Sequence, residues 1–194
     1  MSEHRHGLES LVGGSNESAS FTLEIRATVG HINLRFDSDE SLAAIQSVLG
    51  QDVPREANTV TEGEYRICWL GPDEYLVQCS LESTPALVAS LESAVSGMHV
   101  AVNDISGGTI DFRLGGDDVP GLLSRGTTLD LDKLVSGQCA QSGLAKAAAL
   151  FIPLADQSGF DLVVRRSFAE YLLLWLRDTA GQAGLAVVEE SQVS

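Results

Sequence analysis

The stretch "RICWLGPDEYLVQC", residues 66–79, places two cysteines, a tryptophan and a tyrosine on either side of a short turn. Proline is favoured at the second position of such a turn, where Pro72 lies, and Asp73 and Glu74 keep its tip polar. The flanking residues are mostly β-formers, so the stretch is predicted to form a strand, a turn and a second strand.

The register of this hairpin decides what its cysteines can do. If Leu70 pairs with Tyr75, one face carries Cys68, Leu70, Tyr75, Val77 and Cys79. Cys68 and Cys79 are then diagonal neighbours at about 7–8 Å, which is long for a disulfide without distortion. No C-x2-C or H-x3-H spacing supplies a zinc site. The hairpin is therefore predicted to be scaffold with buried thiols.

Helices are predicted on both sides of the hairpin. Residues 38–50, "SDESLAAIQSVLG", begin with the N-cap Ser38 and end at a glycine, and residues 83–97 carry Pro85 in their first turn. Alternating apolar residues predict strands before the first helix and after the second. Residues 30–104 therefore have the order β-α-β-β-α-β of a ferredoxin-like unit.

The same order returns in residues 108–188. A strand, a short helix capped by Asp117, two strands, a helix opened by a capping box of Ser167 and Glu170, and a last strand follow one another, with residues 127–143 as a loop. The predicted fold class is α+β, with two tandem ferredoxin-like (βαββαβ) units in which helices cover one face of an antiparallel sheet. The predicted parts are a flexible N-terminal arm (1–20), a first unit (21–106), a second unit (107–188) and a tail (189–194).

Composition limits the function classes. Twelve Lys and Arg against 27 Asp and Glu give a formal charge of −15, which repels nucleic acids and anionic membranes. No window approaches 18 consecutive apolar residues, and residues 1–20 contain no apolar signal region. Three cysteines at these spacings do not form a secreted disulfide framework. A cytoplasmic protein is expected, with no nucleic-acid or membrane partner.

The sequence contains no recognisable set of catalytic residues. Glycine pairs occur, but neither G-x-G-x-x-G nor G-x-x-x-x-G-K-[ST] is present. Cys139 lies in a Gly/Ser-rich loop without a histidine to activate it, and Asp104 precedes a glycine turn, where capping is its expected role. The acidic pairs at 117–118 and 130–132 lack calcium-loop spacing. No catalytic, cofactor-binding or metal residue is therefore assigned to this chain.

The helix predicted from Ser167 is apolar nearly all round. Ala169, Leu173, Leu176 and Ala180 line one face, and Phe168, Tyr171, Leu172 and Trp175 line the other. Such a helix is buried on both sides, one side against its own sheet and the other against the sister unit or another protein. The interface candidates are Arg165, Arg166, Phe168, Tyr171 and Trp175, with at least one of the two arginines expected to pair with a partner's carboxylate.

Several stretches resemble a known family. Residues 104–132, "DISGGTIDFRLGGDDVPGLLSRGTTLDLD", residues 137–152, "GQCAQSGLAKAAALFI", and above all residues 160–176, "FDLVVRRSFAEYLLLWL", are similar to the gamma subunit of bacterial heterotetrameric sarcosine oxidase. "WLGPDEYLV", residues 69–77, fits the first half of the same family. The resemblance covers roughly residues 60–180.

The resemblance implies both a fold and a role. The implied fold is that of the folate-binding domain of the glycine-cleavage T-protein, in agreement with the tandem ferredoxin-like prediction. The implied role is a small, non-catalytic and cofactor-free subunit beside alpha, beta and delta chains, in a complex of sarcosine catabolism and one-carbon metabolism. That complex oxidatively demethylates sarcosine to glycine and passes the one-carbon unit to tetrahydrofolate. FAD, FMN and NAD belong to its larger chains, and zinc to the delta chain.

Three alternatives stay open. The complex could be a related N-methyl amino acid dehydrogenase. The chain could be a stand-alone, T-protein-like folate protein, with Asp104 polarising the pterin or amine. It could also be a maturation factor of the same fold, although "SGQCAQSG", residues 136–143, shares only composition with the K-G-C-Y-x-G-Q-E signature of such factors.

Overall fold

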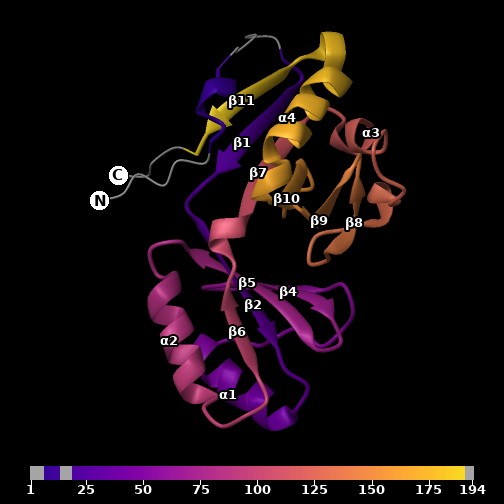
Figure 1. Cartoon of the computed structure of the whole chain (residues 1–194). Helices are drawn as coiled ribbons and strands as arrows, with labels where there is room; N and C mark the ends of the chain where they lie inside the picture. Colours follow the sequence, from indigo (N-terminus) through magenta and orange to yellow (C-terminus); the bar gives the residue numbers. More distant parts are fainter. Residues whose placement is uncertain (1–6, 14–18, 191–194) are drawn as a thin grey trace. The chain divides into compact units, whose positions relative to one another are not determined.

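The computed structural model describes residues 7–13 and 19–190, which form two compact units. The first unit consists of residues 28–107 together with 137–139. The second unit contains the other described residues (Figure 1). Each unit has a core of its own, between one sheet and the helices that cover one face of that sheet.

The first unit is ferredoxin-like. Its β-α-β-β-α-β elements are β2 (Val29–Arg35), α1 (Asp39–Leu49), β4 (Arg66–Gly71), β5 (Glu74–Ser80), α2 (Thr84–Ala94) and β6 (Ala101–Asp104), and β3 (Val60–Glu62) is added at one edge. The strand order is β3-β4-β5-β2-β6, and every neighbouring pair is antiparallel. The predicted order is confirmed, and β3 is an additional edge strand between the first helix and the hairpin.

Local signals place the first helix as predicted. The Ser38 side chain accepts a hydrogen bond from the Ser41 amide, which satisfies one of the free N–H groups of the first turn. Gly50 ends the helix in a left-handed conformation, with φ of 65°. Between these ends α1 buries Ile45 and Leu49 against the sheet.

The second unit repeats the order with additions. Its elements are β7 (Thr109–Gly116), α3 (Val119–Leu123), β8 (Ala140–Leu144), β9 (Ala147–Pro153), β10 (Gly159–Arg165), α4 (Arg166–Ala180) and β11 (Leu185–Glu189). A six-stranded sheet has the order β11-β1-β7-β10-β9-β8, where β1 is Phe21–Arg26. The two tandem units and the fold class are confirmed. Strand β8 lies in the stretch that was predicted to be a loop.

The predicted boundary at residue 21 is wrong, because β1 belongs to the second unit. Its residues pair in parallel with β11 and antiparallel with β7, and its apolar side chains Phe21, Leu23 and Ile25 enter the second core. Only two residues separate β1 from β2, so the sequence favours a hairpin. Strand β1 instead lies between β7 and β11. In an ordinary ferredoxin-like unit, the strands that correspond to β7 and β11 pair directly with each other.

Part of the predicted flexible arm is packed. Leu8 is 3% exposed and lies in the second core, Leu11 and Val12 pack against that core, and the Gly13 amide donates to the Val187 carbonyl. The polar composition of residues 1–20 concealed these apolar residues. Residues 1–6 and 14–18 of the predicted arm, and 191–194 of the predicted tail, lie outside the described residues.

The predicted register of the β4–β5 hairpin is wrong by one residue. Trp69 pairs with Tyr75 and Cys68 with Leu76, and the register shifts between Trp69 and Gly71. A one-residue shift in register places the side chains of β4 on the opposite face, relative to those of β5, from the one predicted. Trp69, Tyr75 and Cys79 therefore face the first core, and Cys68 lies on the opposite face.

Two predicted helix caps are also wrong. Asp118, not Asp117, accepts a hydrogen bond from the Gly121 amide at the start of α3. Helix α4 begins directly after strand β10, with Arg165 at the N-cap and no side-chain cap hydrogen bond, so Ser167 lies inside the helix. The predicted capping box of Ser167 and Glu170 does not form, because the strand leaves no separate turn before the helix.

Candidate functional site

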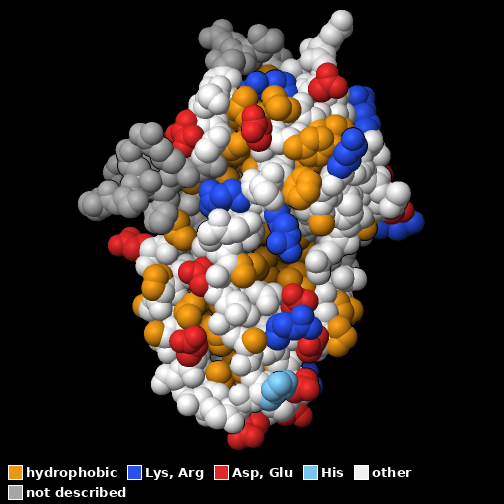
Figure 2. Space-filling view, viewed as in Figure 1, with side chains coloured by type: hydrophobic (Ala, Val, Ile, Leu, Met, Phe, Trp, Pro, Cys, Tyr) orange, Lys and Arg blue, Asp and Glu red, His pale blue; other side chains and the backbone are white. Residues whose placement is uncertain are grey.

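Helix α4 exposes an apolar strip on the face turned away from its sheet. Phe168 is 39% exposed and Leu174 is 46% exposed, while Tyr171 and Trp175 are half-buried at the edge of the core. We call these four residues the α4 strip. Figure 2 shows hydrophobic side chains together with Lys and Arg side chains over this helix. Apolar side chains exposed together on one helix are a feature of interaction sites.

The predicted exposed face of this helix is wrong at one residue, Leu172. Phe168, Tyr171 and Trp175 share a face, as their spacing predicts. Leu172 was placed on that face but is completely buried, and Leu174 is exposed instead. The sequence offers no signal for this exchange, because the helix has three successive leucines and only the orientation of the helix on the sheet distinguishes them.

Close packing fixes Trp175 in the strip. A Cβ atom at Gly126 would lie 2.6 Å from the Trp175 ring and 3.1 Å from the Ala145 amide nitrogen. The Ala145 amide also donates to the Gly126 carbonyl at 2.8 Å. Gly126 therefore forms a shelf on which the indole rests. A rigid, partly exposed aromatic side chain loses little conformational entropy on binding and makes a good interface anchor.

The two predicted arginines differ in environment. Arg166 is half-buried, and its guanidinium donates to the Thr109 carbonyl at 3.2 Å, within the second unit. Arg165, the last residue of β10, is exposed. The structure thus leaves Arg165 at the surface beside the start of α4, whereas Arg166 helps to hold the helix to β7.

Cys68 and Cys139 form a buried pair in the first unit. Residues 137–139 lie beside the chain leading into β3, with the Cys139 amide donating to the Asn58 carbonyl at 2.9 Å. The Cys139 thiol lies 3.5 Å from the Trp69 carbonyl oxygen, and both thiols are completely buried. The hydrogen bond with Cys139, together with burial, raises the pKa of Cys68 well above its usual value. A buried, protonated thiol is a poor nucleophile.

Asp104 has the predicted capping role. Its carboxylate accepts hydrogen bonds from the Ser106 amide at 2.9 Å and from the Ser106 hydroxyl at 2.6 Å. Ser106 in turn binds the amide of His31 at 2.9 Å, so the turn after β6 is tied to β2. The carboxylate oxygen is engaged in this turn, which argues against Asp104 as a group that polarises a substrate.

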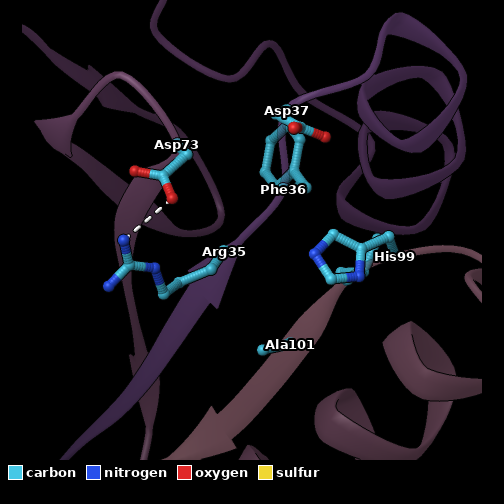
Figure 3. Close-up of a pocket in the computed structure, with 7 residues that line it drawn as sticks. Arg35, Phe36, Asp37, Asp73, His99 and Ala101 are labelled. Carbon is cyan, nitrogen blue, oxygen red and sulfur yellow. Dashed lines mark hydrogen bonds and ion pairs between the residues drawn. The ribbon is translucent and has the colours of Figure 1, made fainter.

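A cavity of about 260 Å³ lies at one end of the first sheet (Figure 3). Its lining residues are Arg35, Phe36, Asp37, Asp73, His99, Val100 and Ala101. Arg35 donates to Asp73 at 2.8 Å, which lowers the pKa of Asp73 and raises that of Arg35. The charged lining groups are therefore largely engaged with each other, and the other ionisable groups, Asp37 and His99, are exposed to solvent.

The described residues hold no group of three or more His, Cys, Asp or Glu side chains placed to bind a metal ion. Within the same residues, no helix has the length and hydropathy that crossing a membrane requires.

Comparison with known proteins identifies first the fold class of the chain and then its family. The chain is similar to the glycine cleavage system aminomethyltransferase T from Bartonella henselae, with a TM-score of 0.62 and 15% identity over 88% of this chain and 48% of that one. It therefore has the T-protein-like fold, in about half the length of that enzyme. The model of the sarcosine oxidase gamma subunit family matches residues 36–182, and the chain belongs to this family.

A solved structure agrees with this assignment. The chain is similar to a chain of the heterotetrameric sarcosine oxidase from Corynebacterium sp. U-96 in complex with pyrrole 2-carboxylate, with a TM-score of 0.80 and 23% identity. The match covers 91% of this chain and 93% of that one. A comparison with curated protein sequences gave no match.

Proposed function

We propose that this chain is the non-catalytic gamma subunit of a bacterial heterotetrameric sarcosine oxidase, in which it supports assembly. The observation that carries the proposal is the match over nearly the full length of both chains to a chain of such an oxidase. Membership of the gamma subunit family supports the same role.

The proposed partners are the alpha, beta and delta subunits. They would supply FAD, FMN, NAD, zinc and the site for tetrahydrofolate, in a complex that converts sarcosine to glycine in the cytoplasm. The residues of this chain are consistent with a supporting role, because the thiols of Cys68 and Cys139 are buried and the candidate acid, Asp104, caps a turn. Another N-methyl amino acid as the substrate of the complex remains the alternative.

We assign the interface to α4. The interface residues are Arg165, Phe168, Tyr171, Leu174 and Trp175, with Arg166 as a residue that positions the helix. Aromatic residues and arginine are the types that contribute most to protein interfaces.

The proposal is tested by purifying the tagged chain from its native cells. Three co-purifying chains with flavin absorbance, and loss of tetrahydrofolate-dependent sarcosine oxidation when this chain is deleted, are the expected results. A colourless, monomeric chain of 20.6 kDa that binds a folate by itself would contradict the proposal and favour the stand-alone folate protein.

A further inference from the structure

Apart from Arg166, the described Lys and Arg residues divide into two groups. Arg26, Arg35, Arg55, Arg66, Arg113 and Lys133 each lie within 4 Å of a carboxylate. Among the described residues, Arg125, Lys146, Arg165 and Arg177 have no such ion pair, although acidic residues outnumber basic ones by more than two to one. An acidic chain that leaves these cations without carboxylates has positive charge available for a partner.

All four of these cations belong to the second unit and lie close to α4. Arg165 immediately precedes the helix. Arg125 donates to the Thr179 carbonyl in its last turn at 2.8 Å, and Arg177 donates to the Leu11 carbonyl at 2.8 Å. Lys146 follows Ala145, the residue beside the Gly126 shelf under Trp175. The α4 strip is therefore bordered by cations, as the blue side chains over this helix in Figure 2 illustrate.

The bordering cations indicate the charge of the partner surface, which the apolar strip alone does not. An apolar strip fits any hydrophobic groove, but a strip bordered by unpaired cations fits a groove bordered by carboxylates. A second copy of this chain fits poorly, because each copy carries a formal charge of −15 and the pair would repel. The acidic residues of α4 itself, Glu170 and Asp178, are exposed, so the partner is expected to place no carboxylate opposite them.

We propose that the α4 strip docks into an apolar groove on another subunit of the oxidase, and that Asp and Glu residues around this groove pair with Arg125, Lys146 and Arg165. This inference rests on the proposed function and names the chemistry of the partner surface. The apolar strip would provide most of the affinity, and the cation border would provide orientation and rate of association.

The test compares matched charge reversals in the purified chain. The variant Arg125→Glu/Lys146→Glu changes the border, and Arg35→Glu/Arg55→Glu makes the same change of net charge at exposed positions of the first unit. Association of each purified chain with the remaining subunits is measured by surface binding at about 50 and 300 mM salt. Circular dichroism and thermal unfolding of each free chain check that it is folded.

The border variant is expected to associate about tenfold more slowly than the wild type at low salt, with the difference shrinking at high salt. The control pair should stay within about twofold of the wild type. Leu174→Ser should raise the dissociation rate at both salt concentrations, since it removes apolar contact and no charge.

Each other result has a definite meaning. Equal association of the border and control variants with the flavin-containing subunits overturns this inference but leaves the proposed function intact. A wild-type chain that associates with none of these subunits overturns the proposed function. A homodimer that is lost in Leu174→Ser, or bound nucleic acid that is lost in the border variant, overturns the inference in favour of that occupant.

Discussion

Asp161 has no exposed surface, yet it lies in the middle of a strand in the second sheet. Arg113 on the neighbouring strand holds it with two hydrogen bonds of 2.8 and 2.9 Å, and Arg26 lies 3.8 Å away. A buried carboxylate is tolerated only when its charge is compensated, and removal of the compensating charge is costly. This pair therefore makes the second unit sensitive to a single substitution.

Arg113→Ala is expected to lower the free energy of unfolding by about 3 kcal/mol, because Asp161 stays buried after losing its two hydrogen bonds from Arg113. Urea unfolding of the variant and the wild type measures the loss. The double variant Arg113→Met/Asp161→Leu is the control, and it should recover most of the stability because apolar side chains replace both members of this ion pair. A single variant as stable as the wild type would contradict the account.

Cys68 is expected to make the free energy of unfolding fall with rising pH in the alkaline range. Its pKa is raised in the folded state, so above about pH 9 the unfolded chain loses a proton that the folded chain keeps. The stability contributed by this thiol is therefore complete below pH 9 and is lost as the pH rises further. Between pH 9 and 10, under reducing conditions, the free energy of unfolding of the wild type should fall more than that of Cys68→Ser. Equal slopes for the two proteins would show that Cys68 titrates normally.

The roles of single residues were predictable where they depend on neighbours in the sequence. The Ser38 cap and the Asp104 turn each depend on a hydrogen bond within three residues of the chain. The exposure of Leu174 and the pairing of Cys68 with Cys139 depend on how separate segments pack, and no local pattern encodes that.

At the scale of elements, β1 is the strand whose position differs most from the prediction. It lies between β7 and β11, so the first strand of the chain completes the core of the second unit. Its central residue Leu23 is completely buried. Leu34, on β2, is completely buried in the core of the first unit and gives a matched position.

Leu23→Ala is expected to destabilise the second unit by about 2–5 kcal/mol through the cavity that it leaves. Hydrogen exchange should become faster in β7 and β11 and stay slow in β4 and β5. Leu34→Ala should do the reverse, with faster exchange in β5 and β6. Faster exchange of β2 and β5 in Leu23→Ala would instead place β1 in the first sheet, as the sequence alone suggested.

The order of elements could be predicted because each strand and helix carries its own periodicity and punctuation. Both βαββαβ series follow from those patterns, and the structure confirms them. The partner of β1, the bulge after Trp69 and the edge strands β3 and β8 could not be predicted. Short strands pair wherever a neighbouring edge and an apolar face are available, and their own sequence does not specify which edge that is.

At the scale of the whole molecule, the described cations are unevenly distributed. The chain is strongly acidic, yet its cations without carboxylate partners among the described residues gather around one helix of the second unit. The same helix exposes the α4 strip. We therefore propose α4 as the surface by which this member of the sarcosine oxidase gamma subunit family contacts its partner subunits.

The aromatic residues of the proposed interface were predictable from the sequence, but Arg125 and Lys146 were not. The aromatic residues Phe168, Tyr171 and Trp175 follow from helical spacing. Arg125 and Lys146 are distant from α4 in the sequence, and only the folded chain brings Arg125 to Thr179 and the residue before Lys146 to the shelf under Trp175. Residues contributed by separate segments are the part of a site that a linear pattern cannot reveal.

Hydroxyl-radical footprinting of the free chain and the assembled complex is the most direct test of this account. It reports the solvent exposure of individual side chains, and Phe168 and Leu174 are exposed in the free chain. We expect their oxidation to fall several-fold on assembly, while that of the exposed Val135 serves as an internal reference on the same unit. Unchanged oxidation of Phe168 and Leu174 in an intact complex would contradict the assignment of α4 as the interface.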